Sequence, residues 1–142
     1  MILTNCRLIP ELCEGFQEEM ADIRIEEDKI AEILPAGGHY TGEEVIDCMG
    51  KTVLPGLYNL HLHICVHDHD PHWLDVKRSE YDHAMNAVSY LHTLLAYGFT
   101  FIRDSGSPYA IAMKLRDRTN AGQMAGPTMK APGYILVPTF VG

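Results

Sequence analysis

The chain has 142 residues, of which 46% are apolar and 21% charged, and its formal net charge is −8. This length suits one ordinary domain, and the composition excludes a disordered chain. The negative charge without a basic run argues against nucleic acid or an anionic membrane as partner. No apolar run approaches the roughly 20 residues of a membrane span, and the N-terminus does not resemble a secretion signal. We therefore expect a cytoplasmic protein.

The first part of the chain, residues 1–54, has the pattern of short strands. "ILTNCRLI" predicts the first strand. "ADIRIEEDKIAEILPA" predicts a hairpin, because Ile23 and Ile25 alternate with polar residues and Glu27-Asp28 interrupts the pattern. "EEVIDCMGKTVLPG" predicts a third extended segment that ends at Pro55-Gly56. We therefore expect this part to be all-β.

The second part, residues 55–142, alternates strands with helices. "LYNLHLHI", "FTFIRD" and "GPTMKAPG" predict three strands. A first helix is expected between an N-cap at Ser79 and Gly98, and a second from Ser107-Pro108 to about Asn120. Strand–helix–strand connections predict right-handed crossovers and a parallel sheet.

The segment after Ser79 has apolar residues at i+3 or i+4 spacing, which predicts an α-helix. The apolar positions are Tyr81, Met85, Val88, Leu91 and Leu95. The two histidines of this helix, His83 and His92, lie outside this pattern, and we expect both to be exposed.

Two closely spaced histidines, His61 and His63, end the first strand of this series. Alternation along a strand puts Asn59, His61 and His63 on one face, with the imidazoles about 6.5–7 Å apart along the strand. Such a pair can supply two ligands to a cation, but a catalytic zinc site takes three protein ligands. An isolated H-x-H is a weak signal; its place at the carboxyl end of a strand, where α/β sites form, strengthens it.

The segment "VIDCMGKTVLPGLYNLHLH" resembles the signature of the amidohydrolase superfamily, which combines V-I-D-x-x-G-x-x-V-x-P-G with a nearby H-x-H. "YGFTFIRDSG" and "GPTMKAPGYILVPT" are similar to the second and third strands of its imidazolonepropionase-like and Xaa-Pro-dipeptidase-like members. The resemblance implies an α/β fold: about three βα strands of a metal-dependent-hydrolase TIM barrel over residues 55–142. It also implies that residues 1–54 form a portion of a small β-sandwich.

The resemblance also implies a function. His61 and His63 match the family's first metal ligands, and the metal is a divalent cation, most often zinc. The implied reaction is hydrolysis of a carbon–nitrogen bond in a small-molecule substrate (a non-peptide amide, a cyclic amide or a dipeptide) through a metal-activated water. Two alternatives stay open: a metal-dependent deaminase of the same superfamily, and a non-catalytic module that binds metal or a partner.

Several residues near the pair have two possible roles. Asn59 stands where the family has an aspartate, which weakens the expected support of the ligands. Arg103 and Asp104 end the second strand, where they form an ion pair, cap the strand or support the histidines. The segment that follows the first strand is either a solvated loop or a substrate loop, and its histidines are His67, His69 and His72.

The remaining family residues are expected after residue 142, so the catalytic acid and base are not assigned. A full barrel takes about 250 residues. We therefore expect the 142-residue chain to be inactive alone. An open barrel edge would favour a homo-oligomer or other association. The four cysteines lack a C-x-x-C pair and are expected to be reduced, with a metal role for Cys65 as the less favoured reading.

Overall fold

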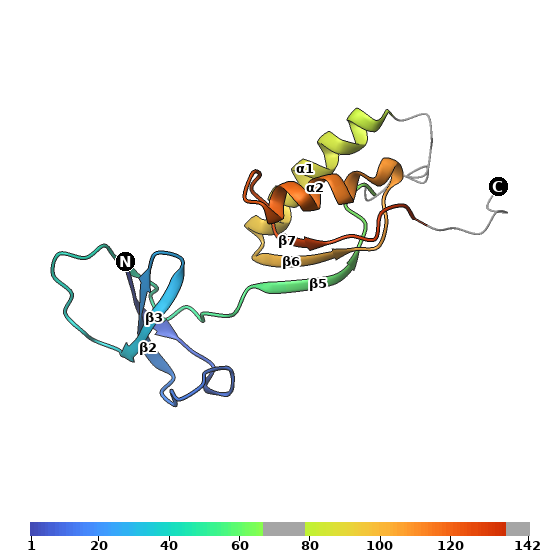
Figure 1. The fold of residues 1–142 in the computed structure, drawn as a ribbon. Helices are drawn as coiled ribbons and strands as arrows, with labels where there is room; N and C mark the ends of the chain where they lie inside the picture. Colours follow the sequence, from blue (N-terminus) through green and yellow to red (C-terminus); the bar gives the residue numbers. More distant parts are fainter. Residues whose placement is uncertain (67–78, 136–142) are drawn as a thin grey trace. The chain divides into compact units, whose positions relative to one another are not determined.

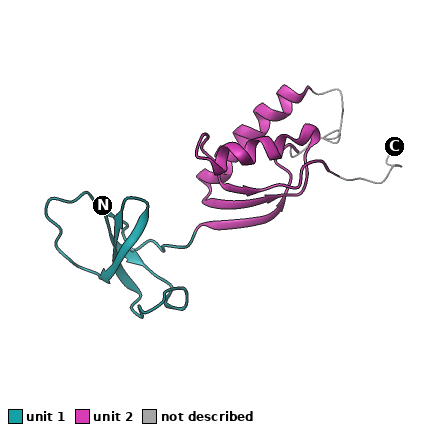
Figure 2. Ribbon diagram, in the orientation of Figure 1, with its two compact units in different colours: residues 1–55 teal, residues 56–142 magenta. Residues whose placement is uncertain are grey.

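A computed structural model describes residues 1–66 and 79–135 of the chain. The chain divides into two compact units, Met1–Pro55 (unit 1) and Gly56–Gly142 (unit 2) (Figure 2). Each unit has its own sheet and its own hydrophobic core. They are described separately below.

Unit 1 is a four-stranded mixed sheet with the strand order β3-β2-β1-β4. The strands are β1 (Ile2–Arg7), β2 (Met20–Glu26), β3 (Lys29–Pro35) and β4 (Val45–Asp47), with a short 3₁₀ helix, η1 (Pro10–Leu12), after β1 (Figure 1). The β1–β2 and β2–β3 pairs are antiparallel, whereas β1–β4 is parallel. The predicted hairpin is confirmed: β2 and β3 pair around a turn at Glu27-Asp28, where Glu27 has a φ of 54°.

One buried carboxylate, Asp22 on β2, organises the polar part of unit 1. Its side chain is 0% exposed and accepts hydrogen bonds from the backbone N–H groups of Asn5, Gly37 and Gly38 at 3.0, 3.2 and 3.1 Å. The Tyr40 hydroxyl donates a further bond at 3.0 Å. Because a buried carboxylate is costly without donors, these bonds explain how Asp22 is accommodated, and they tie the loop after β3 to the sheet.

Unit 2 is a three-stranded parallel sheet with the order β5-β6-β7. Its elements are β5 (Leu57–Leu62), α1 (Glu80–Ala96), β6 (Phe99–Asp104), the 3₁₀ helix η2 (Pro108–Ala110), α2 (Ile111–Asn120) and β7 (Thr128–Lys130). Both α-helices cover the same face of the sheet (Figure 1). The predicted alternation of strands and helices is confirmed, and so is the parallel pairing.

The core of unit 2 lies between this sheet and the two helices. Ile64, Ile102 and Met129 from the strand side are each 0% exposed. They belong to one cluster with residues of α1 and α2, including Leu91 and Ile111. None of the helices in residues 1–66 and 79–135 is long and apolar enough to cross a membrane.

Helix α1 begins where the sequence predicts, at the N-cap Ser79. The Ser79 hydroxyl accepts from the Asp82 N–H at 3.1 Å, and the Asp82 carboxylate accepts from the Ser79 N–H at 3.3 Å, which is a capping box. Gly98 follows the helix with a φ of 86°, a conformation that glycine adopts without strain.

The predicted helix is confirmed, and its buried side overlaps the apolar pattern only in part. The buried positions are His83, Ala87, Leu91 and Leu94, and Val88 packs against the core. Tyr81 and Met85 are 70% and 52% exposed. His83 is 2% exposed, which corrects its expected exposure, whereas His92 is exposed as predicted.

Helix α2 begins later than predicted. Ser107 and Pro108 precede a 3₁₀ turn in which Tyr109 and Ala110 have positive φ angles of 54° and 52°, so a continuous α-helix cannot start before Ile111. Ser107 still acts on the helix start, because its hydroxyl accepts from the Ala112 N–H at 2.9 Å. The strained turn shifts the helix start without removing the serine's bond.

The core of unit 2 predicts different effects for two leucines of the same helix. Leu91 is 0% exposed and Leu95 is 39% exposed. We expect Leu91→Ala to lower the free energy of unfolding by about 2–5 kcal/mol because it leaves a cavity. The matched control Leu95→Ala should cost about 1 kcal/mol or less. Urea unfolding followed by far-UV circular dichroism measures both, since both described α-helices belong to unit 2; equal losses would contradict the packing described.

Candidate metal site

The structure brings His61 and His63 together at the carboxyl end of β5. Their ring centroids are 5.7 Å apart, with an angle of 73° between the ring planes. His61 is exposed and His63 is half-buried. Two imidazoles at this separation can approach one cation from neighbouring positions, as the spacing of the H-x-H predicts.

The His63 ring is oriented by the backbone of the next strand's loop. Its Nδ1 lies 2.9 Å from the carbonyl oxygen of Gly106. A carbonyl only accepts hydrogen bonds, so Nδ1 must carry the proton, and in the neutral ring the lone pair is then on Nε2. Histidine ligands of metals typically use their other ring nitrogen in this way, which fixes the tautomer and the ring orientation.

The pairing register of β5 with β6 shifts between Asn59 and Leu62, a span that includes His61. Asn59 pairs with Ile102 and Leu62 with Asp104, so three steps along β5 match two along β6, as in a β-bulge. The side-chain oxygen of Asn59 accepts a hydrogen bond from the His61 backbone N–H at 3.1 Å. Asn59 therefore shapes the chain at His61; no bond to either imidazole ring is seen within the described residues.

The apolar residues of β5 and the segment after it differ in burial. Leu62 and Ile64 are buried in the core, but Tyr58 is 67% and Leu60 57% exposed. Tyr58 stacks on Phe101 of β6, with ring centroids 4.9 Å apart.

The two residues that end β6 are placed very differently. Asp104 is 0% exposed, and its oxygens accept from the N–H groups of Ile64 at 2.9 Å and Gly106 at 2.8 Å. Arg103 is exposed, and its Nη1 donates to the Leu60 carbonyl at 3.4 Å, a long hydrogen bond. Asp104 therefore caps the ends of two strands, while Arg103 lies against β5 one residue before His61.

Sequence reasoning missed Gly106, whose carbonyl oxygen orients His63. Its φ of 121° lies outside the range that other residues adopt readily, and a Cβ here would be 2.7 Å from Ile135 Cα. A glycine directly after the predicted strand, in "RDSG", was the available signal. Which backbone group it would present to which side chain depends on the pairing of β5 with β6.

The four cysteines are free thiols, as expected. Cys65, two residues past His63, is 1% exposed within the core. Burial, reinforced by the charge of Asp104 and opposed by a hydrogen bond with Ser107, raises the pKa of the Cys65 thiol to about 12. Cys65 therefore lies in the hydrophobic core, and it belongs to no metal-binding group of side chains within residues 1–66 and 79–135.

The other predicted residues do not complete a site. His67, His69 and His72 lie outside the described residues. Within residues 1–66 and 79–135, no three His, Cys, Asp or Glu side chains come together as a metal-binding group. The arrangement therefore suits two nitrogen ligands of a divalent cation, the chemistry zinc favours, but not the three that a catalytic zinc site uses.

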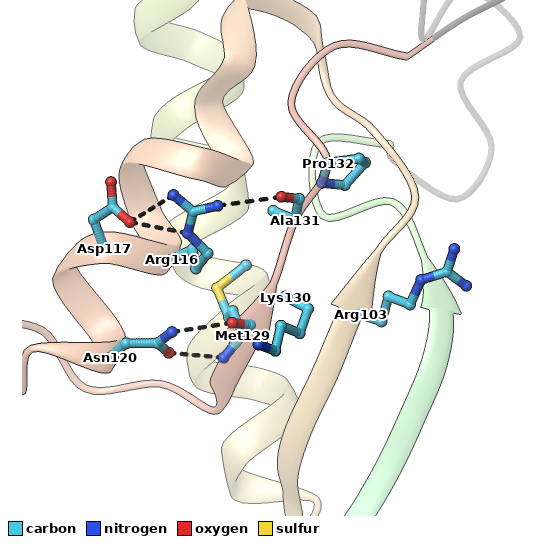
Figure 3. A pocket seen from close by; sticks show the side chains of 8 residues that line it. All are labelled: Arg103, Arg116, Asp117, Asn120, Met129, Lys130, Ala131 and Pro132. Carbon is cyan, nitrogen blue, oxygen red and sulfur yellow. Dashed lines mark hydrogen bonds and ion pairs between the residues drawn. The ribbon is translucent and has the colours of Figure 1, made fainter.

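A cavity of about 570 Å³ lies elsewhere in unit 2, between β6, β7 and α2 (Figure 3). Two polar side chains of α2 that line it, Arg116 and Asn120, form hydrogen bonds within the chain. Asn120 exchanges two hydrogen bonds with the Met129 backbone, at 2.8 and 3.0 Å, and Arg116 binds Asp117 at 2.7 Å and the Ala131 carbonyl at 3.2 Å. The bonds to Met129 and Ala131 hold β7 and the residue after it against α2, so these side chains have a structural role.

The fold and the histidine pair together define a parallel α/β unit with two adjacent imidazoles at the end of its first strand. No protein-family model and no curated protein matches the chain. Solved structures do match it. A Xaa-Pro dipeptidase with methionine bound in its active site is 28% identical, with a TM-score of 0.79, over 94% of this chain and 33% of its own.

Two further structures agree with this match. A candidate prolidase from Bifidobacterium longum is 26% identical, with a TM-score of 0.70, over 99% of this chain and 32% of its own. An amidohydrolase is 25% identical, with a TM-score of 0.71, over 94% of this chain and 31% of its own. These matches to prolidase and amidohydrolase structures are consistent with the amidohydrolase superfamily, and the chain spans about a third of the length of the matched proteins.

The close packing at Gly106 predicts a specific sensitivity. We expect Gly106→Ala to lower the free energy of unfolding by about 1–3 kcal/mol through backbone strain, and further through the contact with Ile135. Gly122→Ala is the matched control, because Gly122 also has a positive φ, of 68°, but open space where a Cβ would lie. Its cost should be about 1 kcal/mol. Urea unfolding compares the two, and a Gly106→Ala cost no larger than the control would contradict the contact.

Proposed function

We propose that this chain is part of a metal-dependent hydrolase that cleaves carbon–nitrogen bonds of amides, including dipeptides, in small molecules. The observation that carries the proposal is the His61–His63 pair, with its rings 5.7 Å apart, at the carboxyl end of a parallel strand. Sites in α/β folds form at that end. The Xaa-Pro dipeptidase and the other matched hydrolases support the reaction class.

The proposal includes an architecture for the whole protein. We propose that β5, β6 and β7 are the first strands of a (β/α)₈ barrel and that the sheet of unit 1 belongs to a small sandwich. In the described sheet β5 and β7 each pair on one side only, as consecutive barrel strands would before further strands are added. The helices on one sheet face support this, since a barrel has its helices outside.

His61 and His63 would hold a divalent cation, and we propose zinc because of its preference for imidazole. A bound dication supplies Lewis acidity, which lowers the pKa of water and polarises a substrate carbonyl. The Gly106 carbonyl keeps the Nδ1 proton of His63 in place at 2.9 Å, and Asn59 fixes the backbone at His61. The remaining ligands and the acid–base residues would come from beyond these residues, so the chain alone is proposed to be inactive.

Zinc binding tests the histidine pair directly. We expect His61→Ala and His63→Ala each to weaken zinc binding to the full chain at least 10-fold in isothermal titration calorimetry, because each removes one of two ligands. His92→Ala is a matched control, since His92 is exposed on α1. A variant with His67, His69 and His72 changed to alanine should keep the binding. Binding that is lost in this triple variant and kept in His61→Ala would contradict the proposed ligands.

Activity tests the reaction class. The 142-residue chain with zinc should give only background turnover of hydantoin, N-acyl amino acid and Xaa-Pro substrates. A chimera in which this chain replaces the matched segment of the Xaa-Pro dipeptidase should hydrolyse Xaa-Pro dipeptides. That turnover should fall at least 100-fold with a chelator or with His61→Ala, and His92→Ala should leave it unchanged. A folded chimera with turnover that is indifferent to His61 and His63 would contradict the proposal.

A further inference from the structure

We infer that Asp104 is a positioning residue that sets the tautomer and orientation of the His63 imidazole through the backbone of Gly106. The inference rests on the proposed function, because it concerns the same pair of histidines. The connection passes from the Asp104 carboxylate to the Gly106 backbone, and from there to His63 Nδ1. Asp104 would thus act through the backbone and not by direct contact with the imidazole.

The first step is the pair of bonds that Asp104 accepts. Its Oδ1 accepts from the Gly106 N–H at 2.8 Å and its Oδ2 from the Ile64 N–H at 2.9 Å. Ile64 directly follows His63, and Gly106 lies two residues after Asp104. The carboxylate therefore joins the residue after the proposed ligand to the loop after β6.

The second step is the bond from His63 to that loop. The Gly106 carbonyl lies 2.9 Å from His63 Nδ1, so the residue that donates to Asp104 also accepts from His63. A further backbone bond, from the Ser105 N–H to the Leu62 carbonyl at 2.7 Å, holds the same two segments in register. The two groups of Gly106 belong to successive peptides joined at its Cα, so a shift of the backbone at Gly106 would move the carbonyl that keeps the proton on Nδ1.

The chemistry of the site requires a carboxylate. Asp104 is 0% exposed and is approached by two N–H donors, and an ionised carboxylate is an acceptor at both oxygens. An asparagine has one acceptor atom and one NH₂ group, so one of the two N–H donors would face another donor. The Gly106 backbone, at a φ of 121°, then loses one of the bonds that hold it.

A purely structural role is the competing explanation, and Asp22 supplies the matched control. Asp22 is also 0% exposed and also accepts backbone N–H bonds, but it lies in unit 1. Asp22→Asn should cost stability as Asp104→Asn does. Only Asp104→Asn should change the state of the His63 ring.

The experiment measures the ring-nitrogen chemical shifts of His63 in the ¹⁵N-labelled full chain by long-range NMR correlation. We expect the Nδ1–H tautomer in the unmodified chain. In Asp104→Asn we expect at least a several-fold gain of the Nε2–H tautomer and a 10–100-fold loss of zinc affinity, the usual effect of losing a group that supports a metal ligand. Asp22→Asn should leave the His63 tautomer unchanged.

Three results would overturn the inference: an Nε2–H tautomer in the unmodified chain, an unchanged tautomer in folded Asp104→Asn, or an equal change in Asp22→Asn. If Asp104→Asn does not fold, Asp104→Ser, which keeps one acceptor without an NH₂ group, is measured instead, and the tautomer of the unmodified chain remains decisive by itself. If the tautomers behave as expected but zinc binding does not involve His61 and His63, the proposed metal site fails while the positioning role stands.

Discussion

The backbone conformation at the carboxyl ends of β5 and β6 depends on one buried carboxylate, that of Asp104. Asp104 has no exposed surface and accepts backbone N–H groups from the segments that follow two neighbouring strands. A charge in that position is tolerable only because donors surround it, and those donors lie in the two loops that would border a site. The requirement to satisfy Asp104 therefore fixes the backbone on which His63 is carried and oriented.

The two sheets place their polar groups in a similar way. In unit 1, Asp22 gathers the N–H groups of a glycine-containing loop, as Asp104 gathers N–H groups at the end of β6. Both carboxylates are fully buried and both bind backbone rather than a cationic side chain in the bonds described. Each unit thus uses an aspartate to hold a loop whose conformation includes glycine at a positive φ.

The likeness to amidohydrolase structures gives this arrangement a chemical meaning. The chain supplies two imidazoles and the backbone that orients one of them, which under the proposed function would be part of a metal site and not a whole one. Matched structures are about three times as long as the portion that this chain covers. The proposed reaction is therefore one to which this chain contributes two ligands and their support.

The sequence by itself determined the order and type of the elements. The alternation of Ile23 and Ile25 on β2 predicts the hairpin, Ser79 predicts the start of α1, and the H-x-H spacing brings His61 and His63 close. These features could be predicted because each depends on residues that are near one another in the sequence. Tertiary structure decided the rest. Which residues of α1 are buried, His83 among them, depends on how the helix packs on the sheet, and the register shift between Asn59 and Leu62 depends on the pairing with β6. The link from Asp104 through Gly106 to His63 joins residues about forty positions apart, so only the pairing of the strands could reveal it.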